Sequence, residues 1–314
     1  MAVNDLITRT DAGPLIPEDE SNVILQAVQE QSAARRLMRT VTMSTKQTRL
    51  PVLSTLPQAY FVDGDAGLKQ TTALQWANRY LIAEEIAVIV PVPDNVIADA
   101  QFDLWAEIRP NLVAAVGRTL DAAVLFGVNK PASWPAAVVP GATAAGNTFA
   151  RGSVADQDVA EDVNQVMALV EDDGFTVNGF AARPRMRSTL RGLRASDGTP
   201  IYSPSLTGAT PATLYGENVA YVDGGAWDET TADLIAGDWT QAVLGIRQDI
   251  SFRVFTEGVV SDNTGTVVLN LMQQDTSALR LTFRVAFQVA NPITSVNLVE
   301  ANRYPFAILA PAGP

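Results

Sequence analysis

The feature that most constrains this chain is a pair of long strand-like runs on either side of a Gly/Asp tip. Residues 41–53 are rich in β-branched side chains, and residues 72–92 come close to alternating apolar and polar positions, as extended strands do. Between them, positions 63–67 read Asp-Gly-Asp-Ala-Gly, which is a turn signal. The sequence therefore predicts a long β-hairpin. Arms of this length cannot bury themselves against one small domain, so we expect the hairpin to lie on a neighbouring molecule.

Two different structures are predicted before the hairpin. Gly13, Pro14 and Pro17 interrupt any periodicity in residues 1–17, which predicts an extended arm. Residues 18–39 carry apolar positions on one face, acidic residues at the start and arginines at the end. This order suits a helix dipole and predicts an amphipathic helix.

A long helix is predicted over residues 103–126, where apolar side chains repeat every three or four positions. Asp103 can cap its start, and Gly127 stands where a C-terminal glycine belongs. Pro110 should either begin the regular helix or kink it, because its ring removes one backbone donor.

The second half of the chain predicts a compact mixed unit and then two long strands. Short helices and short strands alternate between turn signals. The predicted helices cover 156–171 and 184–194, and the predicted strands cover 175–182, 219–222, 234–236 and 242–246. Residues 250–257 and 279–289 then alternate with a period of two around a polar loop, which predicts long antiparallel strands, each half buried. The fold class is therefore α+β.

Composition excludes much chemistry. The 314 residues include no cysteine and no histidine, which removes disulfides, thiolate or imidazole metal ligands and nucleophiles that need a histidine base. With 34 acidic against 22 basic residues, the net charge of −12 disfavours sequence-independent binding to DNA. We therefore expect no enzyme, no cofactor and no metal. No apolar run approaches the ~20 residues of a membrane helix, and no secretory signal is visible, so we expect a cytoplasmic protein that does not enter membranes.

Several local patterns, taken in order along the chain, resemble the major capsid protein family of tailed bacteriophages, which has the Hong Kong 97-type fold. Each pattern is weak alone, and their order and spacing over nearly the whole chain carry the resemblance. They are the segment 81–93 (Leu-Ile-Ala-Glu-Glu-Ile-Ala-Val-Ile-Val-Pro-Val-Pro), Arg183-Pro184 with 190–193 (Leu-Arg-Gly-Leu) and 197–201 (Asp-Gly-Thr-Pro-Ile), 236–239 (Ala-Gly-Asp-Trp) with 245–247 (Gly-Ile-Arg), and 281–290 followed by Asn291-Pro292.

The resemblance implies a fold and an assembly. Subunits of this family form hexamers and pentamers that close into an icosahedral shell around double-stranded DNA, which implies a virion capsid assembled in the host cytoplasm. The implied parts are an N-terminal arm at 1–40, an extended β-hairpin loop at 41–93, a peripheral domain at 94–127 and 250–290 that contains a spine helix at 103–126, and an axial α/β domain at 128–249 with a C-terminal tail at 291–314.

The resemblance also implies partner proteins, and this sequence departs from the family at the residues of a covalent cross-link. Met1 stands directly before the arm, so a separate scaffolding protein is expected, together with a portal; a decoration protein is also compatible. Some members join neighbouring subunits by a Lys–Asn isopeptide bond that a Glu assists. Lys69 is suitably placed near the hairpin tip, but Asp275 and Thr282 occupy the positions of the Asn and the Glu. We therefore expect no cross-link. The family resemblance separately implies that the shell encloses DNA without sequence-specific binding.

Two sets of residues are candidates for contacts between subunits. Trp76 lies on the hairpin, whereas core packing is the default for the other tryptophans. Arginines cluster in one short segment of this acidic chain, at Arg183, Arg185, Arg187, Arg191 and Arg194. This cluster could meet carboxylates of an adjacent subunit, DNA inside the shell, or solvent alone.

Two other functions remain open from the sequence. One is an encapsulin, a bacterial nanocompartment shell of similar fold that holds an enzyme cargo, and the other, more distant, is a carboxylate-based hydrolase. Glu84 and Glu85 argue against the hydrolase, because neighbours on a strand point to opposite faces and cannot share a proton. Shell size, host, scaffold identity and the shell face that carries 183–194 are left open.

Overall fold

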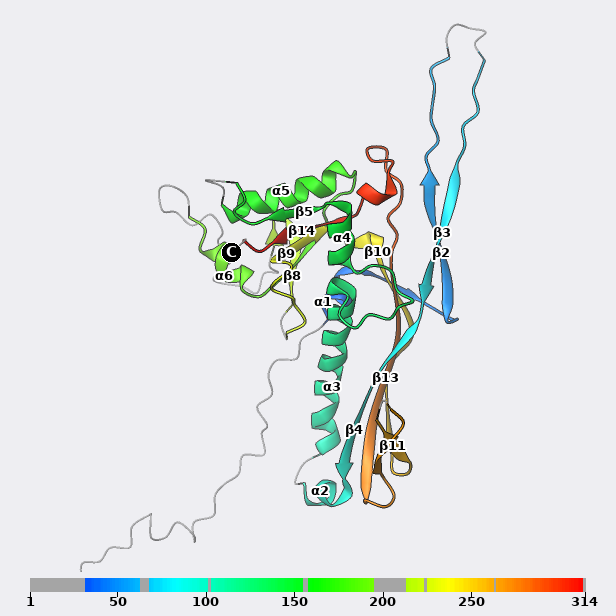
Figure 1. Cartoon of the computed structure of the whole chain (residues 1–314), viewed down its shortest axis with the longest axis vertical. Coiled ribbons are helices and arrows are strands. Elements are labelled where there is room, and N and C mark those ends of the chain that lie inside the picture. Colours follow the sequence, from blue (N-terminus) through cyan, green and yellow to red (C-terminus); the bar gives the residue numbers. More distant parts are fainter. Residues whose placement is uncertain are drawn as a thin grey trace, which may run out of the picture.

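The computed structural model describes residues 32–62, 68–100, 103–154, 158–194, 213–222, 225–262 and 264–312. Within these ranges the strands form two main sheets. The long sheet has the order β1-β10-β13-β4, and the compact sheet has the order β5-β14-β9-β6-β8-β7. Two separate hairpins, β2-β3 and β11-β12, complete the fold. Figure 1 shows a compact upper body, a long lower limb of sheet and helix, and the β2-β3 hairpin projecting upward beside the body.

The long sheet consists of β1 (Arg39–Thr42), β10 (Ala242–Phe255), β13 (Thr276–Val289) and β4 (Glu84–Pro93). Strand β13 lies between β10 and β4 and is antiparallel to both, while β1 runs parallel to β10. The short helix α2 (Asp94–Asp99) follows β4 at the far end of the limb. The limb is therefore a narrow, twisted ribbon rather than a globule.

Helix α3 (Leu104–Asp121) runs along one face of the long sheet (Figure 1). Its start is fixed as predicted, because the Asp103 carboxylate accepts bonds from the backbone N–H groups of Trp105 and Ala106 at 3.0 and 3.2 Å. The helix continues as a π-helical turn (Ala122–Phe126) and ends at Gly127, whose φ is +79°. Pro110 lies inside α3 and does not begin it.

The core of the limb forms where α3 meets the sheet. Leu279, Leu281 and Phe283 of β13 are buried on the side that faces α3. The alternate residues Arg280, Thr282 and Arg284 are only partly buried. Both the helical and the strand periodicity therefore direct apolar side chains to the same core. β13 is nevertheless more buried than the predicted half, because both of its ends are covered on both faces.

The compact sheet is built from distant parts of the chain. It comprises β5 (Thr148–Ala150), β14 (Phe306–Ala310), β9 (Leu234–Gly237), β6 (Gly179–Ala182), β8 (Glu217–Tyr221) and β7 (Thr213–Leu214). Helices α4 (Val138–Ala145), α5 (Val159–Asp172) and α6 (Met186–Arg191) surround it. Strand β14 pairs with β5 and with β9, so the end of the chain is a structural member of this sheet, although a tail was predicted there.

Four predicted boundaries differ from the structure. The helix predicted over 18–39 is α1 (Ala33–Leu37) where it is described, and Arg39 already lies in β1. The run 41–53 is divided between β1 and β2 (Gln47–Thr55), and the run 72–92 between β3 (Gln75–Ile82) and β4. The segments 242–246 and 250–257 form one strand, β10, whose pairing with β13 is irregular around Gln248. A bulge of this kind lets one strand continue through the polar residues that separate the two predicted segments.

Other expectations hold or fall outside the described residues. The helix predicted over 156–171 is α5, with Asp158 as its N-cap, and the helix over 184–194 is shortened to α6. The strand over 175–182 is limited to β6, while the polar loop after β10 contains the small hairpin β11 (Val259–Ser261) and β12 (Val267–Asn270). The arm at 1–17, the hairpin tip at 63–67 and the segment 197–201 lie outside the described residues.

Candidate subunit-contact surfaces

The β2-β3 hairpin is an antiparallel pair whose register places Leu53 opposite Trp76 and Arg49 opposite Tyr80. Beyond these strands the two arms continue away from the body (Figure 1). The described part of the arms carries a run of exposed large apolar side chains: Tyr60, Phe61, Val62, Leu68, Leu74 and Trp76. A concentration of this kind on a projecting element marks a surface that another molecule covers.

The base of the hairpin, in contrast, is fixed to the body. Leu81 and Ala83 pack with Met43, Val243 and Ala286 in a small buried cluster. The backbone carbonyl of Leu53 accepts a hydrogen bond from the backbone N–H of Ile293 at 3.1 Å.

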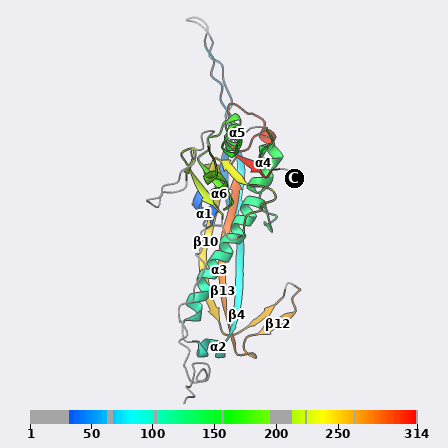
Figure 2. The ribbon, with the colours of Figure 1, turned by 90° about the vertical axis from the view of Figure 1, so that its left-hand side faces the viewer.

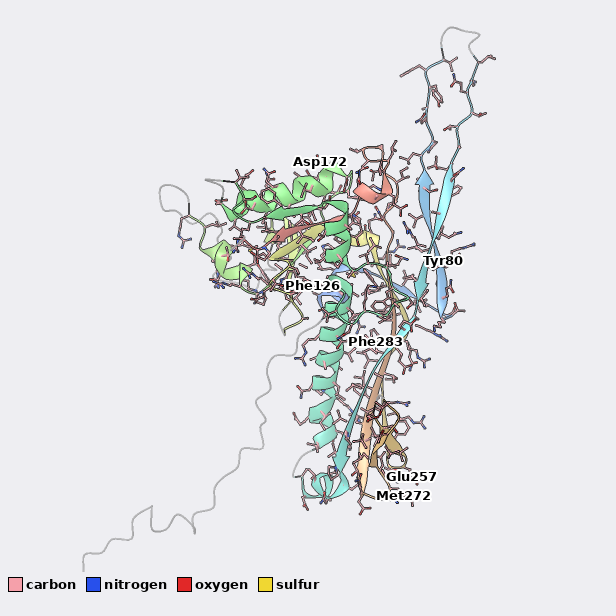
Figure 3. The ribbon with its side chains drawn as sticks, viewed as in Figure 1. Tyr80, Phe126, Asp172, Glu257, Met272 and Phe283 are labelled. Carbon is pink, nitrogen blue, oxygen red and sulfur yellow. The ribbon has the colours of Figure 1, made fainter. Side chains whose placement is uncertain are left out.

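Two side chains extend this anchorage to the strand β3. The amide of Gln288 donates to the carbonyl of Tyr80 at 3.1 Å, and Arg79 forms an ion pair with Glu300. Figure 3 shows Tyr80 beside the body, well below the hairpin end. The hairpin is therefore rigidly placed at its root and uncovered along its outer half.

Trp76 and Lys69 both lie on this uncovered half. The indole of Trp76 is 61% exposed, and Lys69 is also exposed. By comparison, Trp134, Trp227 and Trp239 are buried in the body, as predicted for core tryptophans. The exposure of Trp76 is therefore not a general property of the tryptophans in this chain.

Arg183 differs from the other arginines of its segment. It is almost fully buried, and its guanidinium pairs with the carboxylate of Asp233 at 2.9 Å. Asp233 is fully buried and also pairs with Arg151 at 2.7 Å. Burial raises the pKa of Asp233 above its ordinary value, more than the two guanidinium groups lower it. The charge of Arg183 is thus used inside the subunit, between β6 and β9.

The remaining arginines of the segment are exposed along α6 and at its two ends. The guanidinium of Arg187 lies 4.1 Å from the centroid of the Tyr221 ring. Arg194 donates to the carbonyl groups of Arg191 and Leu193, and Arg185 is exposed beside them. These four side chains, Arg185, Arg187, Arg191 and Arg194, therefore form a positively charged edge of the compact body.

The two positions that bear on cross-linking lie at the long sheet. Asp275 precedes β13 with φ +43°, and its backbone carbonyl accepts from the N–H of Asp94 at 2.8 Å. The hydroxyl of Thr282 lies 2.8 Å from that of Ser251 on the neighbouring strand β10. Asp275 carries a carboxylate where the isopeptide reaction needs an amide, and Thr282 carries a hydroxyl where it needs a carboxylate.

The described residues give no catalytic constellation. Glu84 accepts a bond from Ser133, whereas Glu85 pairs with Arg284, so the two carboxylates point to different partners as predicted. No group of three or more acidic ligands in the described ranges could hold a metal ion. Among the helices that the structure describes, none is long and apolar enough to cross a membrane.

Sequence reasoning missed one buried carboxylate that fixes the N-terminus of α1. Asp121, near the end of α3, accepts bonds from the Ser32 hydroxyl at 2.6 Å and from the backbone N–H groups of Ala33 and Ala34 at 2.9 and 3.0 Å. Burial raises the pKa of Asp121, against the lowering effect of these bonds. The folded subunit therefore holds the Asp121 proton more tightly than the unfolded chain does. The resulting stabilisation is fully present below the ordinary pKa of 3.8 and is lost as the pH rises through the raised pKa of Asp121.

Comparison with known proteins gives consistent matches over almost the full length. The sequence matches the model of the phage capsid family over residues 12–297. It is 27% identical over 289 residues to a major capsid protein of Staphylococcus phage 80alpha, which covers 89% of this chain and 83% of that protein.

Solved structures agree with this match. A structure from Microbacterium phage Oxtober96 is 41% identical, with a TM-score of 0.84 over 97% of this chain and 99% of the other. One from Mycobacterium phage Adephagia is 32% identical, with a TM-score of 0.84 over 98% and 99% of the two chains.

Proposed function

Since the chain belongs to the phage capsid family and is a major capsid protein that forms the virion shell, we propose that the outer half of its β2-β3 hairpin holds neighbouring subunits together. The observation that carries this proposal is the exposure of the apolar side chains on a hairpin whose root is fixed. Leu68 is 92% exposed and Phe61 is fully exposed. Covering such side chains with a neighbour removes apolar area from water, and the gain grows with the area. Many weak contacts of this kind add up in a closed shell.

The finer architecture belongs to the same proposal. Hexamers and pentamers make up an icosahedral shell around double-stranded DNA, assembled in the host cytoplasm with a separate scaffolding protein and a portal. A decoration protein is compatible with the same proposal. Residues 94–127 and 250–290 act as the peripheral domain, and 128–249 and 291–314 as the axial domain. The net charge of −12 supports a shell that encloses DNA without adhering to its phosphates.

The exposed arginine edge has a role in the same assembly. Arg185, Arg191 and Arg194 face outward from the compact body of an acidic chain, and their planar guanidinium groups suit paired contacts with carboxylates. We propose that they meet acidic side chains of the adjacent subunit in the same capsomer. Lys69 makes a non-covalent contact from the hairpin, because the residues needed for an isopeptide bond are replaced by Asp275 and Thr282.

A single substitution on the hairpin tests the main proposal. Trp76→Ser should reduce the yield of shells by about ten-fold or more, because a buried aromatic anchor contributes ~2 kcal/mol or more to an interface. The unassembled subunit should keep its unfolding free energy within ~0.5 kcal/mol, because the side chain is exposed there. Sedimentation measures the shells and urea denaturation measures the subunit. Trp76→Phe retains an apolar ring and should assemble nearly as wild type; normal yield from Trp76→Ser would contradict the proposed anchor.

The two other functions considered from the sequence are not favoured. The relatives named above come from phages, which does not support a nanocompartment shell. A carboxylate-based hydrolase lacks a shared carboxylate pair among the described residues, and the family relationship indicates a structural role.

A further inference from the structure

One face of the long sheet carries an unusual pair of like charges. Arg253 of β10 and Arg280 of β13 stand directly opposite each other in the antiparallel register. On the same face, the next pair along is Ser251 and Thr282. The intervening residues of β13, Leu279 and Leu281, are buried toward α3. The arginine pair therefore lies on the face that α3 leaves open.

The two arginines share one aromatic ring. Their guanidinium carbons lie 4.9 Å (Arg253) and 4.7 Å (Arg280) from the centroid of the Phe255 ring. No carboxylate within the described ranges forms an ion pair with either group, and the buried Nε of Arg280 has no hydrogen-bond partner there. Like charges directly opposite each other destabilise a sheet. Contact with the ring offsets only part of that cost.

A mostly apolar hollow adjoins the arginine pair. This cavity of about 190 Å³ is lined by Ile89, Phe255, Val260, Leu271 and Ala278, together with Arg280 and the carboxylate-bearing Glu257. Its lining residues belong to β4, β10, β11, β13 and the loops beside them, and Figure 2 shows the β11-β12 hairpin leaving the plane of the sheet. That hairpin and the loop after it expose Val259, Val267, Val268 and Met272, and Figure 3 shows Met272 and Glu257 at this end of the limb.

We propose that Arg253, Arg280 and Phe255, together with this hollow, form a receiving site for a second copy of the chain. The occupant presents a carboxylate to the two guanidinium groups and an apolar side chain to the hollow. This inference rests on the proposed function, because it assigns a surface to which a neighbouring subunit attaches. A carboxylate between the arginines replaces their repulsion by two charge-assisted contacts.

The surroundings favour a protein partner over nucleic acid. A surface that binds phosphates sequence-independently neutralises several of them with many basic side chains. Here two arginines are bordered by exposed valines and by a mostly apolar hollow that also contains Glu257, and the chain as a whole carries 34 acidic residues. An acidic copy of the same chain therefore supplies both the carboxylate and the apolar contact.

The test compares shells made from three forms of the full chain, assembled under wild-type conditions in the absence of DNA. Arg253→Ala with Arg280→Ala should give at least about ten-fold fewer shells, while the melting temperature of the subunit stays equal or rises because the repulsion is gone. Arg253→Lys with Arg280→Lys keeps both charges and should recover part of the yield. Arg118→Ala with Arg247→Ala removes the same net charge from exposed positions outside the site and should assemble normally.

Other outcomes overturn the inference. Wild-type yield from the double alanine chain would do so. If such shells, in a separate assay with DNA, then failed to retain it, the arginine pair would be a phosphate site instead. If the double alanine chain does not fold, Arg253→Gln with Arg280→Gln decides in the same way. A parallel sample of Trp76→Ser separates the two proposals, because loss of shells with Trp76→Ser but not with the arginine variants contradicts only the receiving site.

Discussion

A chain that lacks residues 58–70 should fold into a stable subunit and form no shells. None of the described residues between positions 53 and 80 is buried, and the three buried clusters contain no residue from the outer half of the hairpin. The deletion therefore removes nothing that the body needs for its own core. It does remove Tyr60, Phe61 and Leu68, the side chains that the proposal places against a neighbour.

A control chain distinguishes the loss of these side chains from the effect of a shorter hairpin. A second chain in which positions 58–70 are replaced by a Gly/Ser segment of equal length keeps the reach of the hairpin but not its side chains. Both chains should show a single cooperative unfolding transition and sediment as small species. Shells of normal yield from either chain would show that the outer hairpin is not needed for assembly.

Replacing Arg183 by alanine should destabilise the subunit itself, unlike changes at the exposed arginines of the same segment. Breaking a buried ion pair costs ~3–5 kcal/mol, because the remaining charge loses its partner. The loss should lie near the lower limit of about 3 kcal/mol, because Asp233 keeps its second partner, Arg151.

Urea denaturation of the unassembled subunit measures this difference. The matched change Arg191→Ala removes an equal charge from an exposed position of α6 and should alter the unfolding free energy by no more than ~0.5 kcal/mol. Equal stability of the Arg183→Ala chain and the wild type would mean that Arg183 does not serve the internal role described above.

Local signals in the sequence were sufficient to predict the elements that have capping residues at their ends or a regular alternation of apolar side chains. Asp103 and Gly127 define α3 from both ends, and the strict alternation of residues 279–289 defines most of β13. The hairpin was predictable for a related reason, since a tip rich in Gly and Asp between two strand-like runs leaves few alternatives.

The predictions that failed concern features that depend on contacts between residues far apart in the sequence. The division of the run 72–92 near Ala83 arises because β4 pairs with β13, almost 200 residues later, and no local pattern records that pairing. In the same way, Arg183 looked like part of a surface cluster because Asp233, its partner, lies 50 residues away. Strand β14 was mistaken for a tail because a five-residue apolar run has no periodicity that identifies its neighbours.

The receiving site on the long sheet was also beyond sequence reasoning. Arg253 and Arg280 are not close in the sequence, and only the register of β10 against β13 brings them together over Phe255. The hairpin and its need for a neighbouring molecule, in contrast, were predicted from the sequence. Only the arginine pair became visible once the pairing of β10 with β13 was known.

The role of the hairpin can be seen in a cryo-electron microscopy reconstruction of the assembled shell. We expect Phe61, Leu68 and Trp76 of every subunit to be in contact with an adjacent subunit and shielded from solvent. A reconstruction in which the β2-β3 hairpin folds back onto its own body, or stands free in solvent with those three side chains uncovered, would contradict it.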